Sequence, residues 1–336
     1  MKVLVIGGTG VISREIVKQL LHLQHEVTVF NRGQNSLLLS RDVEQIVGDR
    51  YHLDQFRNQF VDRKFDVVID MIAFSKEDAE ETIRVVGSRA NQLIFCSSVA
   101  AYERPLRSLP AVEASEKLLD KPTFLYGFQK AEMERYLQKE IEMKQLAVTI
   151  LRPSLTFGIG SENIGVLRQN YGIVDRIRKG KSLVVFGDGT NSWNFTFAND
   201  MARAFVASVG NPNTYKEAYH VTNSELHNWD DLYLEFGRIL GIEPHIVHIP
   251  TEFLMVAKSE LFSHINDEKK YPGVFDSSKF HRAVPEFHAT TSLHQGLSSI
   301  IEWYEEEQHG VDPVKDMIED HLVALHREWS RQLRTF

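Results

Sequence analysis

Tyr126 and Lys130 are the two residues whose types and spacing most directly suggest chemistry. They lie four residues apart in Tyr126-Gly127-Phe128-Gln129-Lys130, so a helix here would place an ammonium beside a phenol. A free phenol has a pKa of about 10, and a neighbouring cation favours its phenolate. Tyr126 could therefore exchange a proton with a substrate hydroxyl or carbonyl near neutral pH. The spacing alone is also compatible with an exposed helix face, so whether the pair is catalytic must be judged from the surrounding elements.

The first thirty residues predict a strand, a glycine turn, a helix and a second strand. Residues 2–6 are a continuous apolar run, Gly7-Gly8-Thr9-Gly10 follows, and residues 11–23 carry apolar side chains at helical spacing. In Gly7-x-x-Gly10-x-x-Ser13, serine stands where the dinucleotide fingerprint has its third glycine, and serine is small enough for close packing. Such a turn brings backbone N–H groups to a pyrophosphate at the positive end of the helix. The alternative is a purely structural turn.

The end of the second strand, at residues 26–30, indicates which nicotinamide cofactor is bound. NAD sites usually place a carboxylate there for the ribose hydroxyls, whereas this chain has Asn31-Arg32-Gly33. Arg32 could form charge-assisted hydrogen bonds with the 2′-phosphate of NADP. We therefore expect NADP in preference to NAD. The alternative is an exposed loop arginine with NAD bound by other groups.

Strand and helix patterns continue to alternate through the first half of the chain. The predicted elements are strands at residues 43–47, 65–70 and 92–96 and a helix at 76–87. This alternation indicates an α/β fold with a doubly wound parallel sheet of Rossmann type. Ligands of such sheets lie beyond the carboxyl ends of the strands, so Ser97 and Ser98 fall where chemistry is expected. A serine there is also common as a turn or helix cap.

Three motifs in this order resemble the extended short-chain dehydrogenase/reductase superfamily, which contains the NAD-dependent epimerase/dehydratase family. They are the glycine turn, Cys96-Ser97-Ser98-Val99-Ala100-Ala101-Tyr102, and Tyr126-x-x-x-Lys130. Further matches are Leu151-Arg152-Pro153, Phe186-Gly187-Asp188-Gly189 and Phe195-Thr196-Phe197-Ala198-Asn199-Asp200-Met201-Ala202. The resemblance covers residues 1 to 305 and is specific for the family, though not for one reaction within it.

The resemblance implies separate roles for three residues. Ser98 would hydrogen-bond the reacting oxygen, Tyr126 would act as acid and base, and Lys130 would lower the pKa of Tyr126 and contact the nicotinamide ribose. The chemistry agrees, because oxidation of a secondary alcohol needs one group to take the hydroxyl proton while the cofactor takes the hydride. The residues expected to contact the cofactor are Gly7, Thr9, Gly10, Val11, Ile12, Asn31, Arg32, Asp49, Ala73, Tyr126 and Lys130.

Two departures from the family pattern narrow the reaction. Val99 and Ala100 follow Ser98 where the 4,6-dehydratases carry Asp and Glu, so dehydration is disfavoured. Trp193 stands where many nucleotide-sugar enzymes place an arginine on the diphosphate, which puts a nucleotide-sugar substrate in doubt. Trp193 could equally be a packed core aromatic. We expect an NAD(P)-dependent epimerase or reductase acting on a secondary alcohol or ketone of a sugar or nucleotide sugar.

A third departure raises other functions. Asp70-Met71-Ile72-Ala73-Phe74, together with Asn31-Arg32-Gly33, resembles the atypical branch that includes plastid stem-loop RNA-binding proteins, in which the fold can bind or cleave RNA. The chain has 46 acidic and 38 basic residues and a net charge of -8, which argues against binding to a phosphate backbone. A basic cluster at residues 176–181 could instead help bind an anionic substrate. A cofactor-sensing regulator without turnover is a further alternative, which the intact Ser/Tyr/Lys set disfavours.

The motifs predict two lobes and a terminal helix. Residues 1–153 are expected to form the dinucleotide-binding domain, with a returning segment at 195–210. Residues 154–194 and 211–310 would form a smaller substrate lobe. Residues 311–336 repeat apolar side chains along one face of a helix, which would pack on its own lobe or on another subunit.

Composition excludes several classes of protein. No apolar run approaches the roughly 20 residues of a membrane span, and the single cysteine, Cys96, cannot form an internal disulfide. Because the first residues are predicted to form a strand, we expect no signal peptide. We therefore expect a soluble cytoplasmic protein. The 14 histidines contain no evident set of metal ligands. The family resemblance implies a homodimer.

Overall fold

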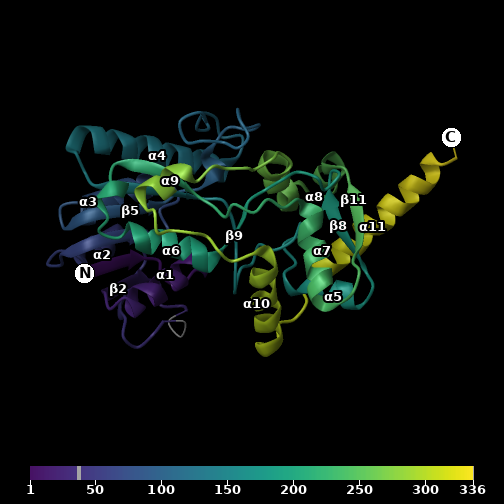
Figure 1. The fold of residues 1–336 in the computed structure, drawn as a ribbon, viewed down its shortest axis with the longest axis horizontal. Helices are drawn as coiled ribbons and strands as arrows, with labels where there is room; N and C mark the ends of the chain where they lie inside the picture. Colours follow the sequence, from purple (N-terminus) through teal and green to yellow (C-terminus); the bar gives the residue numbers. More distant parts are fainter. Residues whose placement is uncertain (36–38, 336) are drawn as a thin grey trace. The chain divides into compact units, whose positions relative to one another are not determined.

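The computed structural model describes residues 1–35 and 39–335, which form two compact units (Figure 1). Unit 1 comprises Met1–Thr156, Ala198–Asn223 and Phe275–Thr290. Unit 2 comprises Phe157–Phe197, Ser224–Val274 and Thr291–Phe336. Each unit has its own sheet and helices.

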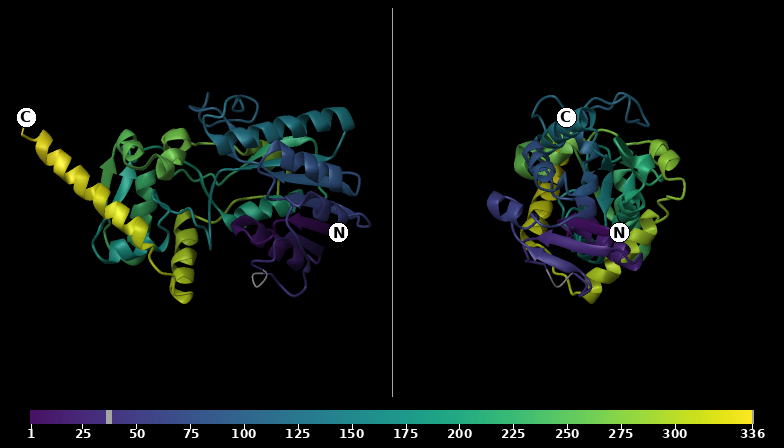
Figure 2. Two further views of the ribbon diagram at one scale, coloured as in Figure 1. Left: turned by 180° about the vertical axis from the view of Figure 1, so that it is seen from behind. Right: turned by 90° about the vertical axis from the view of Figure 1, so that its left-hand side faces the viewer.

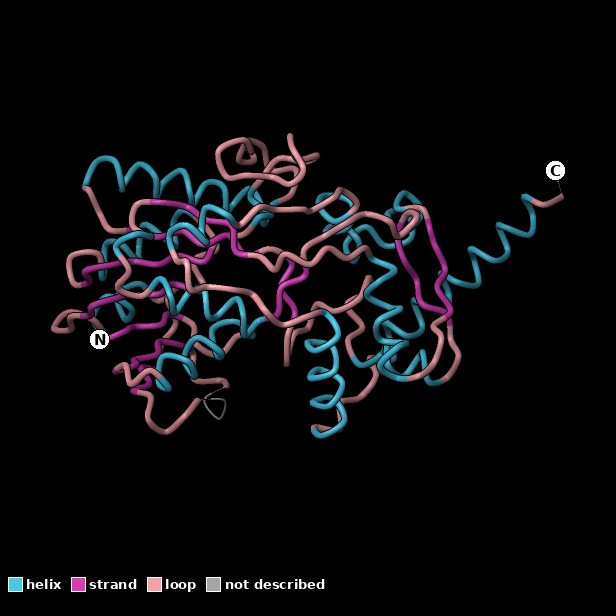
Figure 3. Tube along the Cα trace, in the orientation of Figure 1, coloured by secondary structure: helices cyan, strands magenta, loops and turns pink. Residues whose placement is uncertain are grey.

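A seven-stranded parallel sheet forms the centre of unit 1 (Figure 3). Its strands are β1 (Lys2–Ile6), β2 (Glu26–Asn31), β3 (Glu44–Val47), β4 (Phe65–Asp70), β5 (Ala90–Cys96), β6 (Val148–Pro153) and β10 (Glu217–Val221). They lie in the order β10-β6-β5-β4-β1-β2-β3, with every neighbouring pair parallel. The chain direction across the sheet reverses between β1 and β4, where a doubly wound sheet opens a ligand crevice. The predicted fold class is confirmed.

Helices cover both faces of this sheet (Figure 2). One face carries α1 (Val11–His22), α6 (Ala198–Ser208) and α9 (Ser278–Ala283), and the other carries α2 (Leu53–Asn58), α3 (Lys76–Val86) and α4 (Leu125–Lys144). Successive strand residues alternate between the two cores, because side chains of a strand point to opposite faces. Burial on both faces explains why β1 reads as a continuous apolar run.

Unit 2 is built around a small parallel pair of strands, β8 (Ser182–Phe186) and β11 (His245–Ile249). Its helices are α5 (Tyr171–Arg178), α7 (Trp229–Leu240), α8 (Thr251–His264), a π-helix at Ile265–Lys269, α10 (Leu293–Glu306) and α11 (Pro313–Leu333). The short strands β7 (Leu155–Phe157) and β9 (Phe195–Phe197) pair with each other, and in unit 1 the described residues also form 3-10 turns at Val99–Ala101 and Pro212–Thr214. No helix in residues 1–35 or 39–335 is long and apolar enough to cross a bilayer.

The division into units differs from the predicted lobes by three residues at 154–156 and at 195–197, and by longer segments at two places. Residues 211–223 and 275–290, which we expected in the substrate lobe, belong to unit 1. The reason is that β10 pairs with β6 at the edge of the main sheet, and α9 packs its Phe280 into the core of the α1 face. Apolar periodicity predicts a strand but not its partner.

Helix α11 is anchored to unit 2 through its first half. Its acids bind cations that precede β8, and Leu322 and Val323 are buried. Its second half extends to the C-terminus (Figure 1), and in it Trp329 stacks on Phe253 with ring centroids 4.4 Å apart and Arg327 donates to Ser182 Oγ at 3.0 Å. Met317 and Leu325, both in the predicted apolar stripe, are at least half exposed. The stripe therefore packs on its own unit only in part, and its contact with another subunit stays a prediction.

Candidate active site

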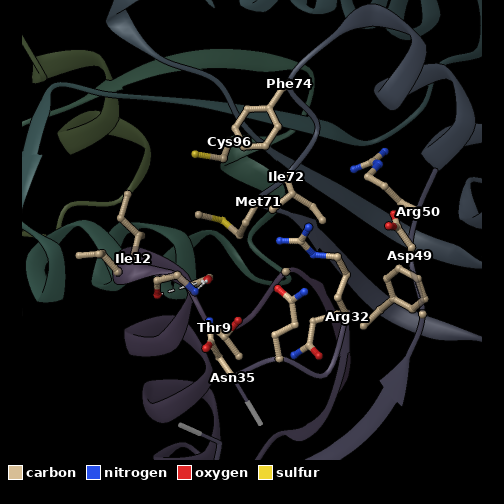
Figure 4. A pocket seen from close by; sticks show the side chains of 18 of the residues that line it. Thr9, Ile12, Arg32, Asn35, Asp49, Arg50, Met71, Ile72, Phe74 and Cys96 are labelled. Atoms are coloured by element: carbon tan, nitrogen blue, oxygen red, sulfur yellow. Dashed lines mark hydrogen bonds between the residues drawn. The ribbon is translucent and has the colours of Figure 1, made fainter. Parts of the chain in front are cut away.

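A cavity of about 540 Å³ opens in unit 1 at the carboxyl ends of β1, β2, β3 and β4 (Figure 4). Its lining residues are Gly7, Thr9, Gly10, Val11, Ile12, Ser13, Phe30, Asn31, Arg32, Gly33, Gln34, Asn35, Gly48, Asp49, Arg50, Tyr51, Met71, Ile72, Phe74, Cys96, Tyr126 and Lys130. The cavity collects every residue predicted to contact the cofactor except Ala73. It lies where the strand order reverses, as expected for a doubly wound sheet.

The glycine turn between β1 and α1 forms one wall of the cavity. Gly8 has a φ of +84°, and a Cβ there would lie 2.5 Å from Val29 Cγ1, so no larger residue fits without displacing β2. Gly10 precedes α1, and its N–H donates to Ser13 Oγ at 2.9 Å. No acidic residue stands in the first turn of α1. The N-terminus of this helix therefore presents uncompensated positive charge suited to a pyrophosphate.

Asn31 and Arg32 form the wall at the end of β2. Asn31 Oδ1 accepts hydrogen bonds from Gly33 N–H and Gln45 Nε2, both at 2.8 Å. Asn31 Nδ2 is buried and has no hydrogen-bond partner among the described residues. Arg32 is exposed, and Figure 4 shows its guanidinium directed into the cavity. The unpartnered Asn31 Nδ2 donor and the Arg32 cation are suited to hydrogen-bond the adenosine half of a dinucleotide.

A buried ion-pair cluster supports the loops that follow β3 and β4. Arg50 Nη1 contacts both carboxylate oxygens of Asp70 at 3.1 Å, and its Nη2 donates to the Asp78 carbonyl at 2.7 Å and to Thr82 Oγ1 at 3.0 Å. Asp70 also accepts from the Ile72 N–H at 3.0 Å. The cluster therefore fixes the loop that carries Met71, Ile72 and Phe74 into the cavity. Asp49, from the same segment, binds the Tyr51 N–H at 3.0 Å.

Lys130 lies at the inner end of the cavity and is 2% exposed. Its Nζ donates to the carbonyl oxygens of Ala73 and Cys96, both at 2.7 Å, and lies 4.9 Å from the centre of the Phe74 ring. Burial lowers the pKa of Lys130, while surrounding acidic groups act in the opposite direction. Two carbonyls and an aromatic face stabilise the ammonium, and one of its three N–H groups remains for a ligand.

Tyr126 and Ser98, the other two predicted catalytic residues, lie on different elements. Tyr126 lines the cavity from the first turn of α4, one turn before Lys130, and is 40% exposed. Ser98 follows β5, is half-buried, and accepts the Ala100 N–H at 3.1 Å, which leaves its hydroxyl hydrogen for donation. Ser98 is not among the lining residues of the cavity. The helical spacing predicted for Tyr126 and Lys130 is confirmed by α4.

A second buried network lies behind these residues and joins their elements. Arg152 of β6 bonds Glu134 of α4 through Nε, at 3.0 Å to each carboxylate oxygen, and through Nη2. Ser97 Oγ donates to the same carboxylate. Arg152 Nη1 donates to the Tyr102 hydroxyl at 2.6 Å, and that hydroxyl lies 2.6 Å from His220 Nε2. Ser97 precedes Ser98 and Glu134 lies one turn after Lys130, so the network holds the predicted catalytic segments together.

Several lining residues escaped the sequence prediction, among them Arg50, Tyr51, Met71, Ile72 and Phe74. They follow the carboxyl ends of β3 and β4, so the rule that found Asn31 and Arg32 could have found them. Sequence gave no sign that the Arg50–Asp70 pair would form, because its members lie on different elements 20 residues apart.

Two other sequence hypotheses concern unit 2. Trp193 is 1% exposed, and its Nε1 donates to the Tyr271 carbonyl at 2.9 Å. It packs on Trp229 with ring centroids 6.4 Å apart, as expected for a core aromatic. In the basic cluster, Arg176 is buried and pairs with acids of α11, so this side chain does not present a surface charge to an anionic substrate. No cluster of three or more potential metal-binding side chains occurs in residues 1–35 and 39–335.

Comparison with known proteins places these observations in a family. The model of the NAD dependent epimerase/dehydratase family matches residues 3–222. The chain is 24% identical over 287 residues to 2'-dehydrokanamycin reductase of Streptomyces kanamyceticus, covering 85% of this chain and 80% of that protein. It is 26% identical over 272 residues to chloroplast stem-loop binding protein of 41 kDa b of Arabidopsis thaliana, covering 75% and 67%.

A solved structure shares the fold. The dTDP-glucose 4,6-dehydratase of Bacillus anthracis in complex with NAD superimposes with a TM-score of 0.74, at 17% identity, over 92% of this chain and 97% of that chain. At this level of identity the likeness supports the architecture alone.

Proposed function

The chain belongs to the NAD-dependent epimerase/dehydratase family, and on that premise we propose that it is an NADP- or NAD-dependent epimerase or reductase. Its substrate would be a secondary alcohol or ketone of a sugar. The observation that carries the proposal is Lys130, buried at the inner end of the cavity that the glycine turn and Tyr126 also line. A buried lysine beside an exposed tyrosine is an arrangement for proton transfer rather than for packing.

The proposed steps use three residues of this chain. When bound, the nicotinamide would supply the hydride donor or acceptor. Tyr126 would hold or release the substrate proton at its phenol oxygen, and the Lys130 ammonium would favour the phenolate. Ser98 would donate its hydroxyl hydrogen to the reacting oxygen. Val99 and Ala100, which follow Ser98, are apolar and buried, so they offer no acid or base for water elimination.

We propose NADP as the preferred cofactor because of Arg32. It stands at the end of β2, where no carboxylate repels a 2′-phosphate, and it forms no ion pair with another described residue. The buried Asn31 Nδ2 beside it offers a further donor. A sugar substrate is supported by the family and by the relative named 2'-dehydrokanamycin reductase.

Calorimetric titration with NADPH and NADH tests whether the protein binds a nicotinamide cofactor, which the proposal requires. NADPH should bind more tightly than NADH, and Arg32→Ala should weaken NADPH by about 10-fold or more, since a hydrogen bond to a charged group contributes about 1.5–3 kcal/mol. Arg41→Ala is the matched control, because Arg41 is exposed and outside the cavity lining. If neither nucleotide binds, the enzyme proposal fails.

Substitution of Tyr126 tests the proton-transfer role. Tyr126→Phe should lower turnover of a keto-sugar by about 10²–10⁴-fold and leave NADPH affinity unchanged. Tyr136→Phe, on the same helix and outside the cavity lining, is the control. Stoichiometric NADPH consumption would identify a reductase, whereas product without net consumption would identify an epimerase. Unchanged turnover in Tyr126→Phe would remove this residue from the mechanism.

The relation to a stem-loop binding protein keeps a second function open to test. Binding to a phosphate backbone is strongly salt-dependent, and the net charge of -8 disfavours it. RNA association that persists at moderate ionic strength and weakens steeply with added salt would support this function.

A further inference from the structure

Four lysine and arginine side chains are buried among the described residues, and one of them lacks a carboxylate partner. Arg50, Arg152 and Arg176 each contact at least one carboxylate. Lys130 is 2% exposed, yet no carboxylate of the described residues lies within ion-pair distance of its Nζ. A buried charge without a partner is costly, so other groups must stabilise the Lys130 ammonium.

The titratable groups that act on Lys130 leave no counter-ion for it. From β4, α3, β5 and α4 these groups are, in chain order, Asp70, Asp78, Cys96 and Glu134. Each of the three carboxylates is already paired with an arginine. Burial raises the pKa of the Cys96 thiol, which therefore stays neutral. Tyr126, one turn before Lys130 on α4, is its proposed partner in proton transfer.

The Phe74 ring lies beside the ammonium where a counter-ion is missing. Lys130 Nζ is 4.9 Å from the centre of the ring, within the roughly 6 Å over which an aromatic face attracts a cation. The carbonyl oxygens of Ala73 and Cys96 accept hydrogen bonds from the same Nζ, both at 2.7 Å. Because Ala73 and Phe74 are consecutive, one loop supplies both a carbonyl and the ring.

The loop that carries Phe74 is fixed to the start of α3. Asp78 Oδ2 accepts hydrogen bonds from the N–H groups of Phe74 at 2.8 Å and Ser75 at 3.1 Å, and Ser75 Oγ accepts the Asp78 N–H at 3.2 Å. The Phe74 side chain is 43% exposed and lines the cavity. Packing in a core therefore accounts for only part of its surface.

From these contacts we propose that Phe74 is a positioning residue, whose ring holds the Lys130 ammonium charged at the inner end of the cavity in place of a carboxylate. A carboxylate there would also stabilise the ammonium, but its negative charge would oppose formation of the Tyr126 phenolate. A neutral ring stabilises the cation without adding that charge. The inference rests on the proposed function, because Phe74 acts through Lys130 in the same proton transfer.

NMR titration of Lys130 in the full chain, without cofactor or substrate, tests the contact independently of turnover. The lysines carry carbon-13 at Cε, and the Lys130 signal is assigned by its loss in Lys130→Arg. The titration midpoint should fall by about half a pH unit or more in Phe74→Leu and in Phe74→Met, since loss of the ring destabilises only the charged form. Phe74→Tyr, which keeps the ring, should restore the wild-type midpoint. Phe253→Leu is the matched control, because Phe253 is 42% exposed and lies on α8 of unit 2.

The pH profile of turnover connects this contact to the reaction. Turnover needs the Lys130 ammonium, so its alkaline decline should begin at lower pH in Phe74→Leu than in the wild type, and Phe74→Tyr should reverse this change. An unchanged Lys130 midpoint in Phe74→Leu and Phe74→Met overturns the inference, as does an unchanged alkaline decline beside a shifted midpoint. Failure of the wild type to bind NADPH or NADH would instead overturn the proposed function, and the Lys130 titration would still decide whether Phe74 stabilises the ammonium.

Discussion

Arg152 in unit 1 and Arg176 in unit 2 are both buried, but the carboxylates around them differ in number. Arg152 is bonded to one carboxylate, Glu134, and to the neutral Tyr102 hydroxyl, while the Glu113 carboxylate acts on it through space. Arg176 faces three carboxylates, with Asp316 at 2.6 Å, Asp320 at 2.8 Å and Glu319 at 3.2 Å. Arg152 is thus paired one to one with a carboxylate that contacts it, whereas three carboxylates contact Arg176.

The difference appears in the pKa values. Burial acts to lower the pKa of Arg152, but the charge and hydrogen bonds of Glu134 overcome this effect and raise the pKa above its ordinary value. In unit 2, burial raises the pKa of Glu319 to about 7, although Arg176 opposes the change. Lys181 Nζ binds both Asp316 and Asp320 at 2.8 Å and supplies a second cation. The stability contributed by the Arg152–Glu134 pair should therefore not depend on pH, and loss of Arg152 should be strongly destabilising. The stability contributed by the acid-rich cluster around Arg176 should depend on pH, and loss of Arg176 should be less destabilising.

The largest expected effect is that of Arg152→Met. Glu134 is 1% exposed, and without Arg152 it would be an uncompensated buried charge, so the free energy of unfolding should fall by about 3–5 kcal/mol. Urea denaturation measures the loss. Arg63→Met is the control, because Arg63 forms an exposed pair with Glu44 at 2.7 Å, and such pairs contribute about 0–1 kcal/mol. Equal losses in the two variants would contradict the importance of burial.

A smaller loss is expected for Arg176→Met, although this arginine faces more carboxylates. Lys181 would still pair with Asp316 and Asp320, and Glu319 could take up a proton instead of remaining charged. We expect the free energy of unfolding to fall by about 1–3 kcal/mol at neutral pH, and by less at pH 5.5 than at pH 8. A loss as large as that of Arg152→Met, or a loss independent of pH, would show that the two networks behave alike.

The pH dependence of Glu319 is the third test. Its pKa is higher in the folded than in the unfolded chain, so the folded state binds the additional proton and the stability contributed by Glu319 falls as pH rises toward 7. Burial lowers the pKa of His264 to about 3, so the stability contributed by His264 rises with pH up to about 6.5. This rise opposes the fall contributed by Glu319, so the pH dependence of the wild type alone does not isolate Glu319. The measured quantity is the difference in unfolding free energy between wild type and Glu319→Gln at pH 5, 6, 7 and 8.

This difference should decrease from pH 5 to pH 7, with a slope of at most about 1.4 kcal/mol per pH unit, and level off at higher pH. Glu305→Gln serves as the control, because Glu305 lies in an exposed pair with Arg178. A difference that stays constant or rises with pH would mean that Glu319 is ionised in the folded chain.

The contrast between the networks also shows what sequence could predict. The strand at 65–70 and the helix at 76–87 match β4 and α3, because local apolar periodicity determines such elements. Glu134 lies four residues after Lys130 on the same helix, so a buried partner for Arg152 could have been sought there. The partners of Arg176 lie 140 to 144 residues away, and no local pattern links them.

The candidate active site shows the same difference between what local sequence patterns predict and what depends on residues far apart in the chain. The dinucleotide cavity is assembled at strand ends of one sheet, where the order of motifs already predicts neighbours, and ten of its lining residues were expected. The contact of Phe74 with Lys130 instead joins the loop after β4 to α4. In the sequence the Phe74 ring was indistinguishable from a core aromatic. Whether an aromatic is buried in a core or lines a cavity depends on packing between elements, which periodicity does not report.

The smallest expected effect concerns Ser97, a neutral member of the Arg152–Glu134 network. Ser97→Ala removes one hydroxyl from Glu134, which keeps its bonds to Arg152, so the free energy of unfolding should fall by only about 0.5–1.5 kcal/mol. Because Arg152 and Glu134 still join β6 to α4, turnover should change little. Ser98→Ala should instead lower turnover strongly at nearly unchanged stability, since the side chain of Ser98 bonds only the Ala100 N–H among the described residues. Parallel urea denaturation and turnover assays of both variants separate the two roles. A large loss of turnover in Ser97→Ala would mean that the buried network affects catalysis as well as stability. Unchanged turnover in Ser98→Ala would remove Ser98 from the mechanism and leave Tyr126 and Lys130 as the catalytic residues.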